Sequence, residues 1–499
     1  MDYHRDLYKS YTKIRPFFER LIEKNEFSEN YMSDFWKKRL DSRENFPNFN
    51  ELVVFRRDHA ASIGYDKNNT VEKEIINFQI NYDRAIFAVP ENFILDNQES
   101  LVGNPFVFSK GKVLSSSAGL NNTVSAYWAL SALSNRIEDS DLENVLEIGA
   151  GYGGVAELII RNKKPKCYVL CDLPHNLYLT AFYLSANHPE YRICFSSDLK
   201  STGQDDYKII LCTPEDIEKI NLNYDFILNT YSFQEMRKKD VHFYFNYISK
   251  KISDRGLFYF LNTFGAAGAD SPSDYPFHKF RVLSWGPANT TQPNFFLKRQ
   301  HAECVMAKKS KEQNFEYFND ISYQIHLLFF SGVGNHLKAV CENLYNDKIE
   351  ENDIRYFHLL NNVLMAKSPS IALRHIDALS DFHKWKMITL YLKGILFILN
   401  GNIENCKQAF RVAIDEGLTG LAKSRTLLAL SITAYRSNDS KRAQNFIDIA
   451  IKNTPQYAVQ LQNIDQNFKF NDFGNLYKFI FPNMNIFNKT NFFKRFLKI

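Results

Sequence analysis

The spacing of apolar residues predicts a helical region at the start of the chain. Leu7, Tyr11, Ile14 and Phe18 recur at intervals of three or four residues, so they would share one face of an amphipathic helix. This part of the sequence contains no motif typical of catalysis. We therefore predict a helical N-terminal region over residues 1–140, in the position of a substrate lid.

From Asn144 the pattern changes to short apolar runs separated by amphipathic stretches, which is typical of an α/β sheet. Five runs predict successive strands: 145–148, 167–171, 209–212, 226–228 and 257–261. Two further runs predict a closing antiparallel pair: 295–297 and 303–307. The sequence thus predicts an α/β domain with a Rossmann-like sheet over residues 141–310.

Beyond residue 313 the pattern becomes helical again and repeats itself. Three sets of buried-type positions align at steps of 34 and then 37 residues: Ala372, Ile376 and Leu379; Cys406, Phe410 and Ala413; Ala443, Ile447 and Ala450. A 34-residue helix–turn–helix unit of this pattern resembles the tetratricopeptide repeat. We predict an all-α TPR-like domain over residues 311–470, with an unrelated helical bundle as the alternative.

Charge changes this picture at the C-terminus. The chain has 61 Lys and Arg against 56 Asp and Glu, a net charge of +5 over 499 residues, which argues against a dedicated nucleic-acid binder. Within the predicted tail, residues 471–499, the segment 473–499 contains five basic residues and no acidic residue, so the rest of the chain is balanced. Basic residues among aromatics suit a peripheral anchor on anionic lipid. Alternatively, these aromatics cap the repeat stack while the lysines face water.

The remaining composition indicates a cytoplasmic protein. If the tail is an anchor, it would place the protein at the surface of the inner membrane. None of the seven cysteines forms a CxxC pair, and four of them fall in apolar runs, so we expect reduced core thiols rather than disulfides or metal ligands. The charged N-terminus lacks the apolar core of a signal peptide, and no run of 18 apolar residues occurs.

The candidate chemistry centres on the sequence VLEIGAGYGG at residues 145–154. A predicted strand ends there, glycines form a turn and a helix begins, which lets a ligand approach the backbone. Gly149, Gly151 and Gly153 fit both a nicotinamide dinucleotide and S-adenosylmethionine (SAM). Glu147 favours SAM, because a carboxylate suits a sulfonium and an ammonium group and would repel a pyrophosphate. The dinucleotide, or a degenerate fold without a ligand, is the alternative.

Further cofactor contacts are expected where the next strands end, because ligands lie beyond the carboxyl ends of strands in open α/β sheets. Asp172 would accept hydrogen bonds from the ribose hydroxyls, and Leu173 would pack near the adenosine. For the adenine edge we favour Thr213 or Asp216, although this segment also fits a simple helix start. The end of the fourth strand, Asn229-Thr230-Tyr231-Ser232, should face the methyl group.

A closer resemblance is carried by four segments: LEIGAGYGG (146–154), CDLPHNLYLTAFYLS (171–185), DFILNTYSFQEM (225–236) and GLFYFLNTF (256–264). They resemble the sugar O-methyltransferase family of bacterial surface-polysaccharide loci, within the class I SAM-dependent methyltransferases. The resemblance covers roughly residues 90–310. It implies methyl transfer to a sugar or glycan hydroxyl during lipopolysaccharide or capsule assembly. The repeat region lies outside it and is a candidate site for a protein partner.

Methyl transfer to a sugar hydroxyl needs a general base or a metal to take the proton. Glu235, in the SFQEM segment, is the first candidate, and its alternative role is to orient the Asn229 loop or cap a helix. His278, after a Gly-rich loop, is the second candidate. Three other residues near strand ends are also candidates: His242, Asp270 and Asp274. No clustered metal-ligand spacing occurs, so we predict no metal, with magnesium bound by two or three scattered acidic residues as the alternative.

The sequence therefore predicts an enzyme, a SAM-dependent sugar O-methyltransferase. One alternative is methylation of another small molecule or of a protein. The other is a scaffold in which the repeats do the work and the SAM domain is vestigial, but the intact glycine turn and Asp172 argue against it.

Overall fold

The computed structural model describes residues 3–23, 33, 36–37, 47–58, 70–134, 142–196, 208–263, 275–287, 301–309, 355–356, 359–360, 362–363, 366, 368–382, 386–416, 418, 420–436 and 438–453. The chain folds into two compact units, Met1–Ala269 and Asp270–Ile499, here called the first and second units. The boundary between them falls inside the predicted 141–310 domain. The predicted domain boundaries stay predictions.

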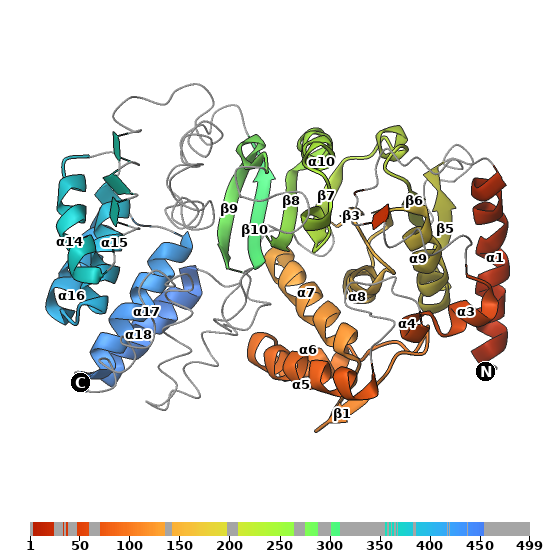
Figure 1. Ribbon diagram of the computed structural model, residues 1–499, viewed down its shortest axis with the longest axis horizontal. Helices are drawn as coiled ribbons and strands as arrows, with labels where there is room; N and C mark the ends of the chain where they lie inside the picture. Colours follow the sequence, from red (N-terminus) through yellow and green to blue (C-terminus); the bar gives the residue numbers. More distant parts are fainter. Residues whose placement is uncertain are drawn as a thin grey trace. The chain divides into compact units, whose positions relative to one another are not determined.

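Six parallel strands form the centre of the first unit (Figure 1). They are β3 (Asn144–Ile148), β4 (Cys167–Cys171), β5 (Arg192–Phe195), β6 (Lys208–Cys212), β7 (Tyr224–Thr230) and β8 (Ile252–Thr263). Their order is β5-β6-β4-β3-β7-β8, and all paired neighbours run parallel. All five predicted strands lie within this set, so the α/β, Rossmann-like class is confirmed. Strand order reverses between β3 and β7, where such sheets bind ligands.

Helices cover the sheet, which explains why its strands read as continuous apolar runs. The connections include α8 (Gly154–Lys163), α9 (Pro174–Asn187) and α10 (Lys238–Lys251), and all five residues of β4 are buried. The six cysteines in the described part of the chain are free and buried, as expected for core thiols. Strand β5 was not predicted, because it is only four residues long and begins with the exposed Arg192 at the edge of the sheet.

Helices precede the sheet, in agreement with the apolar spacing. They are α1 (Tyr3–Glu23), α3 (Phe49–Val53), α4 (Phe55–Asp58), α5 (Val71–Ala88), α6 (Glu91–Asp96) and α7 (Ser117–Ser134). The four residues predicted to share a face of α1 are all buried, and α1 contacts α9, beside which it lies in Figure 1. The region also contains a short hairpin, β1 (Phe108–Lys110) with β2 (Val113–Ser115), which the sequence pattern did not predict.

The second unit begins with strands and continues with helices. Strands β9 (Phe280–Pro287) and β10 (His301–Lys308) form an antiparallel pair. The predicted run 303–307 lies in β10, but its partner is β9 rather than residues 295–297, which lie outside the described residues. The pairing is thus confirmed for one strand and corrected for the other, because β9 mixes Arg, Ser, Gly and Pro with its apolar residues and does not read as a strand.

In the part of this unit that the structure describes, the α-helices with given bounds are α14 (Pro369–Ile376), α15 (Lys386–Leu399), α16 (Ile403–Asp415), α17 (Gly420–Arg436) and α18 (Ser440–Asn453). Each contacts the next one in sequence, and all nine aligned repeat positions are 1% exposed or less. This burial agrees with stacked helical hairpins, while the TPR-like assignment stays a prediction. The tail 473–499 lies outside the described residues. Within the described part, no helix is both long and apolar enough to cross a membrane.

Gly394 allows α15 and α16 to approach closely. A Cβ atom at this position would lie 2.4 Å from Cε1 of the fully buried Phe410 ring. We expect Gly394→Ala to destabilise the second unit, because overpacking costs about 1–3 kcal/mol and the gain in helix propensity is only about 1 kcal/mol. Urea unfolding followed by circular dichroism measures this loss. Adding Phe410→Leu should recover part of it, whereas an unchanged or raised midpoint for Gly394→Ala would contradict the expectation.

Candidate functional site

The glycine turn after β3 consists of three residues in the left-handed region. Gly149, Gly151 and Gly153 have φ values of 75°, 60° and 89°, which side-chain-bearing residues rarely adopt. A Cβ atom at Gly149 would lie 2.0 Å from Oγ of Ser232, whereas nothing lies within 4 Å of one at Gly151. Gly153 is the N-cap of α8. The turn therefore packs tightly at its first glycine and is open at its second, beside the start of a helix.

Asp172 connects this turn to the start of α9. Its Oδ2 accepts a hydrogen bond from the Gly151 N–H (2.8 Å), and its Oδ1 accepts from the Leu173 N–H (2.6 Å) and from Nδ2 of Asn176 (2.9 Å). Burial raises the pKa of Asp172 to about 6, and the three hydrogen bonds oppose that shift. The carboxyl group is thus mostly ionised near neutral pH. The structure brings together Gly151 and Asp172, two of the predicted cofactor residues.

Glu147 lies inside β3 and is 1% exposed. Its Oε2 accepts a hydrogen bond from the Tyr168 hydroxyl (2.8 Å). Burial raises the pKa of Glu147 to about 8, and the charge of Asp172 adds to the effect. The sequence argument assumed a negative charge at this position. In the structure the group is mostly protonated near neutral pH, so a bound cation would be needed to favour its ionised form.

This raised pKa predicts a pH dependence of stability. The folded state keeps a proton on Glu147 that the unfolded state releases above pH 4.5, so stability is full below pH 4.5 and is lost as pH rises towards about 8. Asp172 acts in the same direction over a lower range, from 3.8 to about 6. In Glu147→Gln, the urea midpoint should fall less between about pH 5 and about pH 8.5 than in the wild type. An identical pH dependence would contradict the assignment.

Asn229, at the end of β7, is fully buried and bonded within the protein. Its Nδ2 donates to the Ile148 carbonyl (2.7 Å) and to Oγ of Ser232 (2.5 Å), while its Oδ1 accepts from Nδ2 of Asn262 (2.9 Å) and from the Phe233 N–H (3.3 Å). These bonds tie the carboxyl end of β7 to that of β3. Asn229 therefore positions the two strand ends, and its predicted contact with a cofactor stays a prediction.

Tyr231 belongs to the strand end that the sequence predicts to face the methyl group, and that expectation stays a prediction. It has a φ of 61°, and its N–H donates to the Leu261 carbonyl (2.7 Å). Its hydroxyl accepts a hydrogen bond from Nη2 of Arg84 on α5 (3.4 Å). Non-glycine residues in the left-handed region cost about 1–3 kcal/mol and gather at functional sites. The contact of Tyr231 with Arg84 was not predicted, because the two residues lie 147 positions apart in the sequence.

At the end of β6, the third predicted strand, Asp216 is bonded within the protein, although it was one of two candidates for the adenine edge. Asp216 pairs with Nζ of Lys219 (2.5 Å) and accepts from Oγ of Ser196 (2.9 Å), and it precedes the short helix η4 (Ile217–Lys219). This arrangement fits the helix-start alternative and leaves Thr213, half-buried, as the better candidate for the adenine edge. Leu173 is buried and packs against Trp36, and its predicted contact with the adenosine stays a prediction.

The candidate bases are described unequally. Glu235 lies in η5 (Phe233–Glu235), directly after β7, and is 6% exposed. The side chain of His278, in the second unit, and all of Asp270 and Asp274 lie outside the described part, and His242 is exposed on α10. Within the described ranges, no group of three or more His, Cys, Asp or Glu side chains suits a metal ion. Of the two candidate bases whose side chains are described, Glu235 is therefore the buried one and directly follows a strand.

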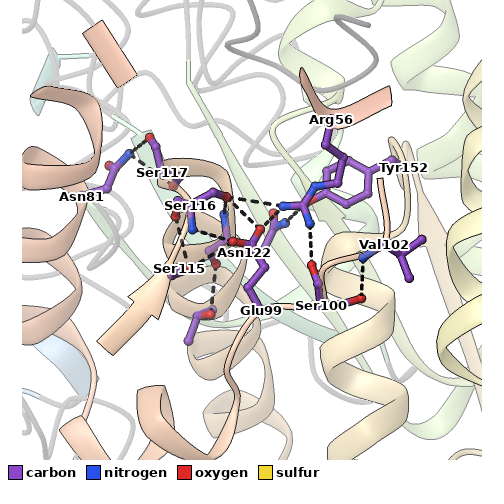
Figure 2. Close-up of polar contacts among 12 residues, drawn as sticks. Arg56, Asn81, Glu99, Ser100, Val102, Ser115, Ser116, Ser117, Asn122 and Tyr152 are labelled. Carbon is purple, nitrogen blue, oxygen red and sulfur yellow. Dashed lines mark hydrogen bonds and ion pairs between the residues drawn. The ribbon is translucent and has the colours of Figure 1, made fainter. Parts of the chain in front are cut away.

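A buried polar network anchors the glycine turn to the N-terminal helices (Figure 2). Arg56 forms an ion pair with Glu99, whose Oε2 also accepts from the Ser116 N–H (2.5 Å). The Arg56 guanidinium lies 5.0 Å from the ring centre of Tyr152, and the Tyr152 hydroxyl accepts from Nδ2 of Asn122 (2.7 Å). Tyr152 belongs to the glycine turn, so the helical region holds that turn in place. No pattern in the sequence predicts this network, because its members lie far apart along the chain.

No protein-family model matches the chain, and no curated protein matches it either. Among solved structures, similarity is found to a mitomycin 7-O-methyltransferase (14% identity, 38% of this chain and 57% of that one, TM-score 0.27). It is also found to a SAM-dependent methyltransferase of Leishmania major (13%, 45% and 82%, 0.27). A third is a coclaurine N-methyltransferase bound to N-methylheliamine and SAH (12%, 70% and 94%, 0.26). The chain thus spans little more than half the length of the mitomycin enzyme.

Proposed function

We propose that the first unit binds SAM and transfers its methyl group to a hydroxyl of a sugar or glycan acceptor. The observation that carries the proposal is the pairing of an open turn at Gly151 with the ionised carboxylate of Asp172. A dinucleotide pyrophosphate needs free backbone N–H donors at such a turn. Here the Gly151 N–H is donated to Asp172, so the turn presents a carboxylate and suits a cationic ligand.

Four residues fit the parts of SAM. Asp172 has acceptor capacity left for one ribose hydroxyl at Oδ2, since each carboxylate oxygen offers two lone-pair sites and Oδ2 accepts only from the Gly151 N–H. Leu173 gives an apolar surface for the adenosine, and Glu147 lies close enough to Asp172 for their charges to interact. The space at Gly151 would take the methionine part. When bound, SAM supplies an electrophilic methyl group on a sulfonium.

The protein's own part in the reaction is positioning and proton removal. Asn229 holds the end of β7 against β3, which fixes the edge where acceptor and methyl group would meet. With SAM held by Asp172 and the glycine turn, the acceptor oxygen would bond to the methyl carbon while the carbon–sulfur bond breaks and its electron pair passes to sulfur, which would give S-adenosylhomocysteine (SAH). Glu235 takes the hydroxyl proton.

We infer a sugar acceptor from the four sequence segments that resemble sugar O-methyltransferases. The same resemblance is the basis for a role in lipopolysaccharide or capsule assembly. Two further proposals rest on the sequence alone. The helices of the second unit bind a protein partner, and residues 473–499, if they do not cap the repeats, contact a membrane surface from the cytoplasm.

Calorimetric titration of the full chain tests the function. SAM and SAH should both give saturable heats, and NAD⁺ should give none at about 0.5 mM ligand. Binding of NAD⁺ without SAM would support the dinucleotide alternative. If none of the three binds, the proposed enzyme fails and the scaffold alternative gains support.

Glu235→Gln tests the general base. Turnover should fall by roughly 100-fold or more, since positioned acid–base catalysis contributes about 10²–10⁴-fold, while SAH affinity stays unchanged. Methyl transfer from labelled SAM to a glycan extract of cells carrying the gene is the measurement. Glu215→Gln, at an exposed site after β6, is the matched control. Equal turnover of the two variants would reject Glu235 as the base.

A further inference from the structure

Arg84 on α5 carries a charge without an acidic partner. Its side chain is half-buried, yet none of the ion pairs in the described part of the chain involves it. The neighbouring Asp83 pairs instead with Nζ of Lys110 (2.8 Å). The Nε of Arg84 is buried and has no hydrogen-bond partner among the described residues. Partly buried guanidinium groups are normally paired, because removing a charge from water is costly.

The partners that Arg84 does have are neutral, and they hold it in place. Its Nη1 donates to Oδ1 of Asn121 (2.8 Å) and, at 3.4 Å, to Oδ1 of Asn81. Asn81 in turn donates to Oγ of Ser117 on α7 (2.7 Å), the bond drawn in Figure 2. Two helices therefore fix the guanidinium before any ligand arrives. A preorganised arginine loses little conformational freedom on binding an oxyanion.

Arg84 contacts a residue at the carboxyl end of β7, next to the proposed site of methyl transfer. Its Nη2 donates to the hydroxyl of Tyr231, 3.4 Å away, and Tyr231 is the strained residue directly after β7. The end of β7 is bonded through Asn229 to the end of β3, from which the glycine turn departs. The unpaired cation thus contacts a residue that adjoins the proposed site of methyl transfer.

We propose that Arg84 binds an oxyanion of the acceptor, so that the substrate is an acidic sugar, bearing a carboxylate or a phosphate, rather than a neutral one. This inference rests on the proposed function and specifies its substrate class. Asn81, Asn121 and Tyr231 engage three of its five N–H donors, and the two that remain, on Nε and Nη2, lie on one edge of the planar guanidinium, which suits two oxygens of a carboxylate or a phosphate. Arg84, with Asn81 and Asn121 as positioning residues and Tyr231 beside it, then determines which glycans enter.

Chemical labelling tests the proposal on the wild-type full chain. Phenylglyoxal modifies arginine, and peptide mass spectrometry reports its rate at Arg84 against the exposed Arg57 as internal reference. We expect glucuronate or glucose 1-phosphate to slow modification of Arg84 several-fold, and glucose and SAH to leave it unchanged. Protection by glucuronate alone identifies a carboxylate, and protection by glucose 1-phosphate alone identifies a phosphate. Protection by SAH would assign Arg84 to the carboxylate of the cofactor. If neither glucuronate nor glucose 1-phosphate slows the modification of Arg84, the proposed oxyanion site is overturned.

Variants give a second, independent measurement. Titration of glucuronate and glucose 1-phosphate into SAH-saturated protein should show affinity lowered about 10- to 100-fold in Arg84→Gln and less in Arg84→Lys. Arg57→Gln is the matched control and should bind like the wild type. Unchanged affinity in Arg84→Gln would overturn the proposal. Failure of SAH itself to bind the wild type would be a failure of the proposed function, and the labelling experiment without SAH would still report on the oxyanion site.

Discussion

Replacing Asp172 by Ala is expected to weaken SAM binding by about 100-fold or more. A hydrogen bond to a charged group contributes about 1.5–3 kcal/mol, and both this bond from a ribose hydroxyl and the attraction of the carboxylate for a cationic ligand would be lost. The Gly151 N–H would also lose its acceptor. Asp172→Asn separates the two effects, because the amide oxygen still accepts from Gly151 while the charge is gone. Calorimetric titration with SAM should rank Asn between the wild type and Ala.

A matched control for Asp172 is Asp225, which lies near the amino ends of β7 and β3, opposite the carboxyl ends where the glycine turn begins. Oδ2 of Asp225 accepts hydrogen bonds from the Glu143 N–H (3.1 Å) and the Asn144 N–H (3.0 Å), at the start of β3. Asp225→Ala therefore removes a carboxylate that also bonds backbone N–H groups, but far along β3 from the glycine turn. It should lower the melting temperature and leave SAM affinity unchanged. If Asp172→Ala binds SAM like the wild type, the ribose assignment is wrong.

The sequence pattern predicted correctly those strands that are buried on both faces of the sheet. Strands such as β4 are covered on both faces, so every residue is apolar or a thiol, and a run of this kind stands out between amphipathic helices. The short edge strand β5 and the mixed sequence of β9 carry no such signal. Tertiary pairing decides whether such segments become strands, and local pattern does not contain it.

Candidate site residues could be predicted from the sequence where they follow a recognisable strand, because strand ends meet at the same side of the sheet. Gly151 and Asp172 could be placed because each directly follows a recognisable strand. Arg84 and Tyr231 are 147 positions apart, and their contact depends on how α5 packs. The protonation of Glu147 also escaped prediction, because a pKa depends on burial and neighbouring charges that no spacing rule supplies.

Two glycine variants should separate stability from binding at the turn. Gly149→Ala combines a left-handed φ, costing about 1–2 kcal/mol, with a Cβ placed 2.0 Å from Oγ of Ser232, which adds about 1–3 kcal/mol of overpacking. We expect a clearly lower melting temperature, partly recovered by adding Ser232→Gly.

Gly151→Ala should behave in the opposite way, because nothing lies within 4 Å of its added Cβ. Only the backbone cost of about 1–2 kcal/mol applies, so the variant should remain folded. The methyl group would, however, occupy the space proposed for the methionine part of SAM, and affinity should fall at least about 10-fold, the equivalent of about 1.4 kcal/mol. Melting curves and SAM titrations on both variants measure the separation. If Gly151→Ala binds SAM like the wild type, the open side of the turn is not where the ligand lies, and the carboxylate of Asp172 must serve the turn alone.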